Sequence, residues 1–343
     1  MGAADVLRGA RTVVVKVGSS LAASDGPFSF GGLASDLAPM AGRVCVVSSG
    51  AVAFGRRRLS LRGDSLPERQ ALSAAGQTAL MRAWEDALAG ERLVAAQLLL
   101  TPDVTDDRAR YLNARAAART LMAAGAVPVV NENDAVATEE LRYGDNDGLA
   151  ARVAGLIDAD LLVLLSDVDG LYADDPRAVP DAAHVDVVPA GQAEALGRGA
   201  TAAGSGVGTG GMRSKVAAAS LATGWGIPVI VASGRTARPL TAIAEGARAT
   251  LFEAGTARPA RRRWLAGTAG RQGAVEIDAG AAAALAGGAS LLAVGVTEVV
   301  RPFRRGELVE ARAGGRPVAF GLAGCSSETL DGVVLRVDDL ILA

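Results

Sequence analysis

Two lysines stand out among the residues that could do chemistry. The chain has 35 basic residues, and all of them except Lys16 and Lys215 are arginine. An ammonium is a compact point charge and a guanidinium is a broad planar fork, so arginine cannot replace lysine at every site. Both lysines lie in segments rich in glycine. We therefore interpret them as functional cations, against the alternative that drift in an arginine-rich chain left two lysines behind.

The segments around both lysines suggest a phosphate site. Lys16 lies in the apolar run 11–17, which continues into Gly18-Ser19-Ser20. A lysine in a buried strand is costly unless its amine reaches an anion, and the N–H groups of the following small residues can face phosphate oxygens. A salt bridge is the alternative explanation. Lys215 follows the glycine-rich stretch 204–211, at the start of a helix expected at 212–223, and helix N-termini favour anions.

Other catalytic signatures are missing from the sequence. Lys215 follows Gly-Met-Arg-Ser, so it does not belong to a Walker A motif, and neither a protein-kinase signature nor a G-x-S-x-G elbow occurs. The single histidine, His184, lies in a polar segment and is expected to be solvated. Lysines, carboxylates and glycine-loop amides remain, and this set suits phosphoryl transfer, in which catalysis is mainly positioning and charge stabilisation.

Two segments crowd acids and amides together. They are Asn-Glu-Asn-Asp at 131–134 and Gly-Asp-Asn-Asp at 144–147. Such groups can hold an ammonium group and a carboxylate, although either segment alone could reflect turn chemistry. Asp167 follows the apolar run 161–165, where it could orient lysine ammonium groups.

Alternating apolar runs and helical segments predict an α/β fold with a buried parallel sheet. Strands are expected at 11–17, 44–47, 93–100, 127–130, 161–165 and 227–231, and helices at 30–41, 66–89, 108–124, 145–158 and 212–223. Ser65 and Glu68 form a capping-box pattern before the second helix. Polar residues gather after the strand ends, where open α/β sheets bind ligands.

The pattern changes near residue 256. We expect a catalytic domain at 1–257, a basic linker at 258–270 and a small β-rich domain at 271–343. Short strands are expected at 274–277, 291–294, 307–310, 317–320 and 333–337, and a helix at 280–286. Residues 258–343 hold 11 arginines against 9 acidic residues, which we interpret as a solvated face rather than an RNA surface.

Composition excludes several classes of protein. The net charge of −2 offers no general attraction to nucleic acid or to anionic membranes. The two cysteines, Cys45 and Cys325, do not suggest a disulfide framework or a zinc site and fit a reducing compartment. No signal peptide and no apolar run of about 18 residues is visible, so we expect a cytoplasmic protein.

The order of the motifs resembles that of the glutamate 5-kinases, members of the amino-acid kinase family. The motifs are Lys16-Val-Gly-Ser-Ser, Ser48-Ser-Gly-Ala-Val, Pro128-Val-Val-Asn-Glu-Asn-Asp-Ala-Val, Gly144-Asp-Asn-Asp, Ser166-Asp-Val-Asp-Gly-Leu-Tyr and Gly208-Thr-Gly-Gly-Met-Arg-Ser-Lys. The resemblance covers residues 11 to about 265 and implies an open α/β/α sandwich. The C-terminal part is similar to the PUA domain, with a short stretch between Gly324 and Val333.

The resemblance also implies roles for individual residues. Lys16 and Lys215 would neutralise charge on the transferred phosphoryl group, and Asp167 would hold both lysines. The ATP site would be lined by Lys16, Ser166, Asp167, Thr209, Gly210, Gly211, Met212, Arg213, Ser214 and Lys215. Glutamate would be bound by Ser49, Asp134 and Asn146. Mg²⁺ would be held mainly by the phosphates of ATP, with no protein ligand named.

Partners and alternatives follow from the same resemblance. The substrates would be ATP and L-glutamate, the product γ-glutamyl phosphate of proline synthesis, and proline a feedback inhibitor; we also expect a homo-oligomer. The alternatives are a relative acting on aspartate, N-acetylglutamate, carbamate or UMP, and an RNA-binding protein acting through its C-terminal domain. The paired acid–amide segments favour free glutamate, and the short PUA-like domain argues against RNA.

Overall fold

The computed structural model describes residues 2–23, 28–101, 104, 108–136, 146–174, 179, 181–193, 211–255 and 273–342. The chain divides into two compact units, a larger one formed by Met1–Val104 and Tyr111–Ala257 and a smaller one that contains Arg258–Ala343. Each unit has a hydrophobic core of its own. Among the described residues, none of the helices combines the length and apolar character needed to cross a membrane.

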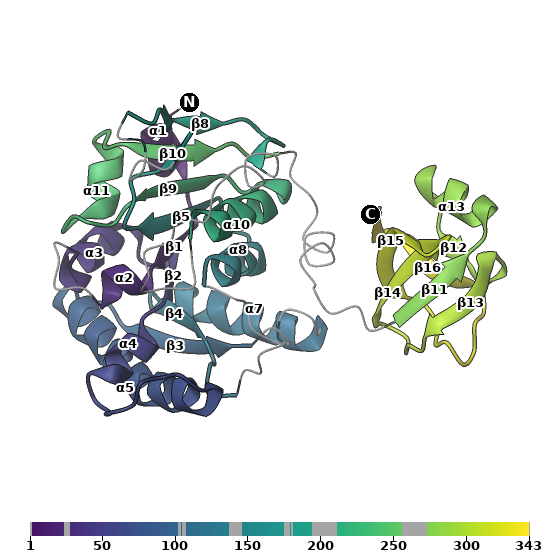
Figure 1. Cartoon of the computed structure of the whole chain (residues 1–343), viewed down its shortest axis with the longest axis horizontal. Helices are drawn as coiled ribbons and strands as arrows, with labels where there is room; N and C mark the ends of the chain where they lie inside the picture. The colour runs from purple at the N-terminus through teal and green to yellow at the C-terminus, as the bar shows by residue number, and fades with distance from the viewer. Residues whose placement is uncertain are drawn as a thin grey trace. The chain divides into compact units, whose positions relative to one another are not determined.

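A twisted sheet forms the centre of the larger unit (Figure 1). In the described part of the chain it has eight strands in the order β3-β4-β2-β1-β5-β9-β10-β8. Neighbouring strands are parallel except β9 and β10. The strands are β1 (Val13–Val17), β2 (Val44–Ser48), β3 (Ala95–Leu100), β4 (Val127–Glu132), β5 (Leu161–Ser166), β8 (Val187–Val188), β9 (Val229–Ser233) and β10 (Ala249–Phe252).

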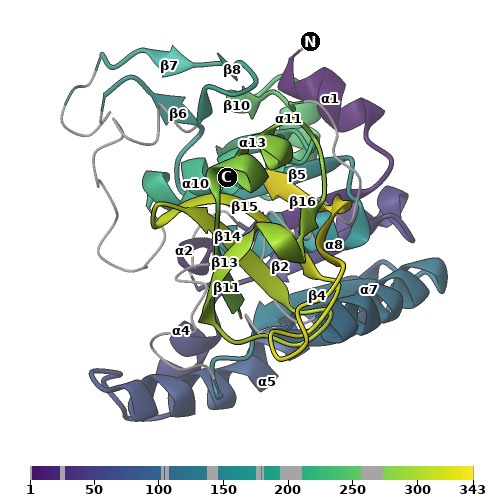
Figure 2. The ribbon, with the colours of Figure 1, turned by 90° about the vertical axis from the view of Figure 1, so that its right-hand side faces the viewer.

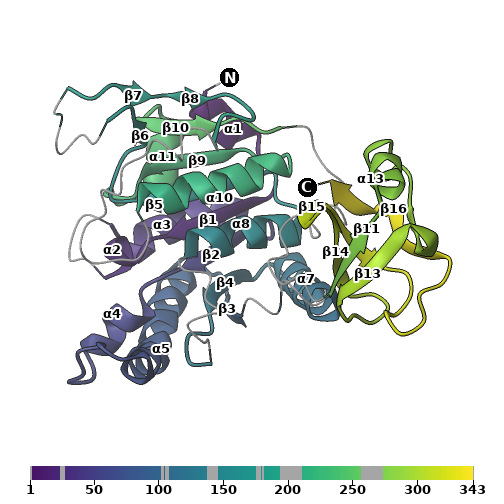
Figure 3. The ribbon, with the colours of Figure 1, turned by 45° about the vertical axis from the view of Figure 1, so that its right-hand side comes forward.

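Helices cover both faces of this sheet. Helices α3 and α11 lie on one face, and α8 and α10 lie on the other, in front of β1, β5 and β9 in Figure 3. The helices are α1 (Ala3–Gly9), α2 (Ser19–Ala22), α3 (Phe30–Leu37), α4 (Ala51–Arg56), α5 (Leu66–Gly90), α7 (Arg108–Ala123), α8 (Asn146–Ile157), α10 (Met212–Gly224) and α11 (Pro239–Ala244). The expected open α/β/α sandwich is therefore confirmed.

The sequence signals for individual elements have clear counterparts. The Ser65 hydroxyl caps α5 by accepting a hydrogen bond from the N–H of Glu68 at 3.4 Å. The Glu68 carboxylate accepts from the N–H groups of Gly63 and Asp64, so it ties the preceding loop to the helix rather than closing a capping box. The helix expected at 30–41 ends earlier, at Leu37, and a 3₁₀ turn at Ala38–Met40 follows.

His184 differs from its expected solvated state. It lies in β7 (His184–Val185), which pairs with β6 (Leu171–Tyr172). Its side chain is only 9% exposed, and its Nδ1 atom lies 2.7 Å from Asp186. The ring packs edge-on against Tyr172. This pairing of two short strands, which local sequence signals do not reveal, buries the imidazole.

The smaller unit is built around a second sheet, which Figure 2 shows together with helix α13. Among its described residues, six strands follow the order β12-β16-β15-β14-β11-β13. The elements are β11 (Gly273–Ile277), α13 (Ala279–Ala286), β12 (Leu291–Leu292), β13 (Val296–Arg301), β14 (Leu308–Ala313), β15 (Arg316–Ala323) and β16 (Val333–Leu342). The expected small β-rich domain is confirmed, and β13 is a strand that the sequence did not suggest.

Candidate active site

Lys16 and Lys215 meet at one buried carboxylate. Lys16 lies in β1, whose neighbours on both sides are parallel strands, and its Nζ atom is 2.5 Å from Oδ1 of Asp147. Lys215, in the first turn of α10, places its Nζ atom 3.2 Å from Oδ2 of Asp147. The side chains of both lysines are 6% exposed, and that of Asp147 is fully buried. The two cations of the sequence prediction therefore come together in three dimensions.

The two ammonium groups determine the ionisation of Asp147. Burial by itself would raise the pKa of Asp147. The ammonium groups of Lys16 and Lys215, together with a hydrogen bond from Ser214, outweigh burial and lower the pKa of Asp147 to about 2. The carboxylate is thus ionised at neutral pH. Its single negative charge faces two positive charges, so the three groups together carry a net charge of +1. A buried site with an excess positive charge favours an anionic ligand.

The contact expected of Asp167 with both lysines stays a prediction, and the described structure adds a second carboxylate to it. The carboxylate that joins both lysines is Asp147, in the first turn of α8. Helix α8 packs against β1 and α10, so its first turn brings Asp147 between the two lysines. Asp167 follows the end of β5, where it accepts a hydrogen bond from Ser166 at 3.1 Å and lies 3.9 Å from Arg235.

The segments expected to contact phosphate are partly described. Thr209 and Gly210 lie outside the described residues. Gly211 is the N-cap of α10, and the first turn of that helix, which includes Met212, Arg213 and Ser214, contains no acidic residue. The N–H groups of this turn therefore offer an anion site beside Lys215. On the other side, a Cβ atom added to Gly18 would lie 3.9 Å from Nζ of Lys16, an ordinary van der Waals distance, so the backbone at Gly18 lies next to the ammonium group.

A cavity of about 660 Å³ lies at the carboxyl ends of β5 and β9. Its lining includes Asp167, Asp169, Tyr172, Ser233, Arg235 and Arg248. The Tyr172 hydroxyl donates a hydrogen bond to Asp169 at 2.8 Å and accepts one from Arg248 at 3.2 Å. Cavities at this edge of an open α/β sheet are where ligands bind. The cavity has the size and mixed polarity of a small-molecule site, and Asp167 belongs to it.

The residues expected to bind glutamate gather at the ends of β2 and β4 and the start of α8. Ser49 follows β2, and its N–H donates a hydrogen bond to Val17 at 3.0 Å. The Asn146 side chain donates to Oδ1 of Asn131 at 2.7 Å and to the Ser48 carbonyl at 3.5 Å. Asn146 also precedes Asp147 in the chain, so this polar group adjoins the lysine pair. Asp134 accepts a hydrogen bond from Ser73 of α5 at 2.9 Å.

Sequence reasoning missed two residues that organise the site, Asp147 and Asn131. Both lie inside motifs that it had singled out. Asp147 lies in the first turn of a helix that is buried on nearly every side, so the spacing of apolar residues along α8 does not distinguish it from its neighbours. Asn131 is 2% exposed at the end of an apolar strand, and a buried amide there needs hydrogen-bond partners.

Comparison with known proteins identifies the family of the chain. The amino acid kinase family matches residues 11–233, and the PUA domain family matches residues 273–337. A glutamate 5-kinase of Caulobacter vibrioides (strain NA1000 / CB15N) is 49% identical, with 100% of this chain and 99% of the relative covered. A glutamate 5-kinase of Rhodopseudomonas palustris (strain TIE-1) is 50% identical, with 88% of this chain and 83% of the relative covered. One of Gluconobacter oxydans (strain 621H) is 46% identical, with 93% of this chain and 87% of the relative covered. The chain therefore belongs to the amino acid kinase family, among its glutamate 5-kinases, and carries a PUA domain.

Proposed function

We propose that the protein transfers the γ-phosphoryl group of ATP to the γ-carboxylate of L-glutamate, yielding ADP and γ-glutamyl phosphate, the first intermediate of proline biosynthesis. The observation that carries the proposal is the buried arrangement of Lys16, Asp147 and Lys215 beside Asn146. It joins a site for a transferring phosphoryl group to a set of amides and carboxylates suited to an amino acid.

The lysines act on the charge of the phosphoryl group. In the transfer, a bond forms between a glutamate carboxylate oxygen and the γ-phosphorus, and the bond from that phosphorus to the β–γ bridging oxygen breaks. Negative charge spreads over the equatorial oxygens and the leaving oxygen. Ammonium groups held in a water-poor site stabilise that charge without reorganising. Asp147 fixes both groups in place through its ion pairs at 2.5 and 3.2 Å.

The acceptor carboxylate needs no general base. A glutamate side chain has a pKa of about 4.3 and is already ionised at neutral pH. The task left to the protein is to hold the carboxylate in line with the phosphoryl group. We assign the polar groups of glutamate to Ser49, Asp134 and Asn146, because these residues come from chain segments that meet next to the lysine pair.

The nucleotide is assigned to the edge of the sheet beyond β5 and β9. The nucleotide would contact Ser166, Asp167 and the first turn of α10, together with Thr209 and Gly210 before that turn. The cavity of about 660 Å³ would bind its nucleoside part. Mg²⁺ would enter on the phosphates of ATP and neutralise part of their charge. Asp147 is not assigned to it, because both of its oxygens are already bound to lysine.

The proposal is tested by trapping the product. Incubation with ATP, Mg²⁺ and hydroxylamine converts an acyl phosphate to a hydroxamate. Glutamate is expected to give hydroxamate, whereas aspartate, N-acetylglutamate, carbamate and UMP are expected to support little phosphoryl transfer, measured as ADP release. Equal turnover of aspartate would contradict the assignment of substrate. The same assay with added proline tests feedback inhibition, and light scattering tests the expected homo-oligomer of a cytoplasmic enzyme.

RNA binding is not part of the proposal for the PUA domain. Of the three clustered arginines 301, 304 and 305, Arg301 lies 3.4 Å from the buried Glu310, which Arg312 also contacts at 3.1 Å. An arginine paired within its own domain has less charge to offer to phosphates. A salt-dependent gel shift with structured RNA would overturn this expectation.

A further inference from the structure

One face of helix α5 reaches the glutamate site through three polar side chains. Ser73, Gln77 and Trp84 are four and then seven residues apart, a spacing that keeps side chains on one side of a helix. Each contacts a different chain segment. Ser73 donates to Asp134 at 2.9 Å, Gln77 accepts from Asn131 at 2.8 Å, and the Trp84 indole donates to the Ser48 hydroxyl at 2.9 Å.

Gln77 and the backbone of Glu132 together set the direction of a chain of amides. Oε1 of Gln77 accepts from Nδ2 of Asn131, which leaves Oδ1 of Asn131 to accept from Nδ2 of Asn146 at 2.7 Å. The N–H of Glu132 donates to the same Oδ1 at 2.9 Å. Because an amide has donors at one end and an acceptor at the other, fixing one amide fixes the next. Asn146 therefore uses its donors inside the protein and has Oδ1 left to accept a hydrogen bond.

Without the acceptor on Gln77, the Asn131 amide loses one of the two contacts that fix its orientation, and only the N–H of Glu132 still holds it. The NH₂ end of Asn131 would then be free to tilt about the remaining contact, which would displace Oδ1 from Nδ2 of Asn146, and Asn146 would have to move in response. Asn131 is 2% exposed, so water offers little replacement for the lost acceptor. An amino-acid substrate carries one strong donor that could use Oδ1 of Asn146, its α-ammonium group.

We propose that Gln77 is a positioning residue that orients Asn146, through Asn131, for the α-ammonium group of the amino-acid substrate. This inference rests on the proposed function, because it concerns recognition of that substrate. Gln77 touches neither the lysine pair nor the nucleotide cavity among the described contacts. Its loss should therefore act on the binding of the amino acid and leave the binding of ATP unchanged.

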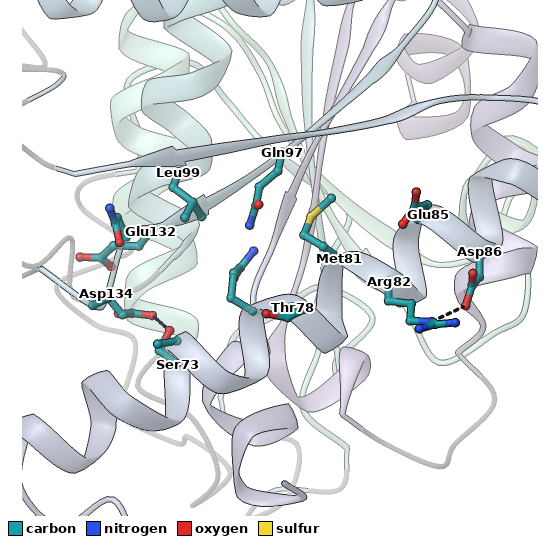
Figure 4. A pocket seen from close by; sticks show the side chains of 14 residues that line it. Ser73, Thr78, Met81, Arg82, Glu85, Asp86, Gln97, Leu99, Glu132 and Asp134 are labelled. Atoms are coloured by element: carbon teal, nitrogen blue, oxygen red, sulfur yellow. Dashed lines mark hydrogen bonds and ion pairs between the residues drawn. The ribbon is translucent and has the colours of Figure 1, made fainter. Parts of the chain in front are cut away.

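The chain offers a matched control in the same pocket. Gln77 and Gln97 both line a cavity of about 590 Å³ between α5, β3 and the end of β4. Figure 4 shows Gln97 on the β3 side of this cavity, apart from the hydrogen bond between Ser73 and Asp134. Gln97 is exposed, and its side chain makes no hydrogen bond to Asn131 in the described structure. Gln97→Met thus makes the same chemical change as Gln77→Met in the same cavity.

The experiment compares glutamate with glutarate, which has both carboxylates but lacks the amine. Gln77→Met should raise the KM for glutamate about tenfold, the size of one lost hydrogen bond. The inhibition constant of glutarate and the KM for ATP should stay within about twofold of wild type. Gln97→Met should alter none of the three, and Gln77→Glu, which keeps the acceptor for Asn131, should restore most of the glutamate affinity.

Parallel loss of glutamate and glutarate binding would overturn the inference, as would an unchanged KM for glutamate in Gln77→Met or no recovery in folded Gln77→Glu. If Gln77→Met does not fold, Gln77→Asn, whose shorter side chain cannot reach Asn131, takes its place with the same expected result. A wild-type enzyme that fails to phosphorylate glutamate would instead contradict the proposed function itself, so the two failures are distinguishable.

Discussion

Asp147 is the carboxylate that contacts both lysines of the site. It balances two buried ammonium groups, and they in turn keep its pKa at about 2. Breaking a buried ion pair by removing one partner costs about 3–5 kcal/mol, because the remaining charge stays buried. An anionic ligand at the lysines would lower that cost. We therefore expect Asp147 both to stabilise the fold and to position the two lysines for the phosphoryl group.

This reasoning separates Asp147 from Asp167. Asp147→Asn should lower kcat by about 10²-fold or more, because the lysines lose the group that fixes them. Asp167→Asn is the matched control and should mainly raise the KM for ATP, because Asp167 lines the proposed nucleotide cavity. Steady-state kinetics on both variants, with circular dichroism as a check on folding, measure the difference. A larger kcat loss in Asp167→Asn would contradict the placement of the two carboxylates.

Individual site residues differed in how far the sequence could predict them. Lys16 and Lys215 were visible because their type is rare in this chain and their neighbours are glycines. Asp147 is one of three acidic or amide residues in a row, and residue type alone does not say which of them a helix turns inward. The choice depends on the packing of α8 against β1 and α10, which is a property of the assembled fold.

At the scale of elements, two glycines allow helices α4 and α5 to touch. A Cβ atom added to Gly76 would lie 1.8 Å from the carbonyl oxygen of Ala51, and one added to Gly55 would lie 1.9 Å from that of Leu72. These are backbone atoms, so the clash cannot be relieved by turning a side chain. Helix α4 begins directly after Ser49 and Gly50, so the close packing also fixes the end of β2.

Gly76→Ala should consequently destabilise the enzyme by about 2–3 kcal/mol and raise the KM for glutamate, because α4 must move. Gly90→Ala, in the same helix, is the control, since a Cβ atom there meets nothing within 4 Å. It should change stability by less than about 1 kcal/mol. Urea unfolding followed by kinetics compares the two. Equal stability of both variants would show that α4 and α5 are not held at this distance.

The main strands and helices were predictable because each has a strong local pattern. The buried central strands are nearly continuous apolar runs, and α5 begins at a recognisable cap. Strands β8 and β10 were missed. β8 has two residues and β10 has four; β10 pairs antiparallel with β9, and β8 pairs parallel with β10. Such short strands are stabilised by their neighbours and leave little trace in the sequence.

At the scale of the whole molecule, each unit buries an apolar core of its own. The lysine pair, the amide chain and both cavities discussed above belong to the larger unit. We therefore expect that catalysis does not require a side chain from the PUA domain. The expected boundary near residue 257 remains a proposal, because residues 256–272 lie outside the described part of the chain.

Truncation after Ala257 should accordingly leave measurable kinase activity in a soluble product. The hydroxamate assay, run on full-length and truncated protein at equal concentration, measures the remaining rate. A reduced rate that follows a change in oligomeric state would assign the PUA domain to assembly. Complete loss of activity in a folded truncation would show that the boundary, or the independence of the catalytic unit, is wrong.

The central claim is that two ammonium groups stabilise the transferred phosphoryl group, and the kcat of the lysine-to-arginine variants tests it most directly. Arginine keeps the charge but replaces a compact ammonium with a wider planar group, in positions where the lysine side chains are only 6% exposed. Lys16→Arg and Lys215→Arg should each lose about 10²-fold or more in kcat for glutamate phosphorylation while remaining folded. Near wild-type kcat in either folded variant would contradict the claim, because a plain positive charge would then be sufficient.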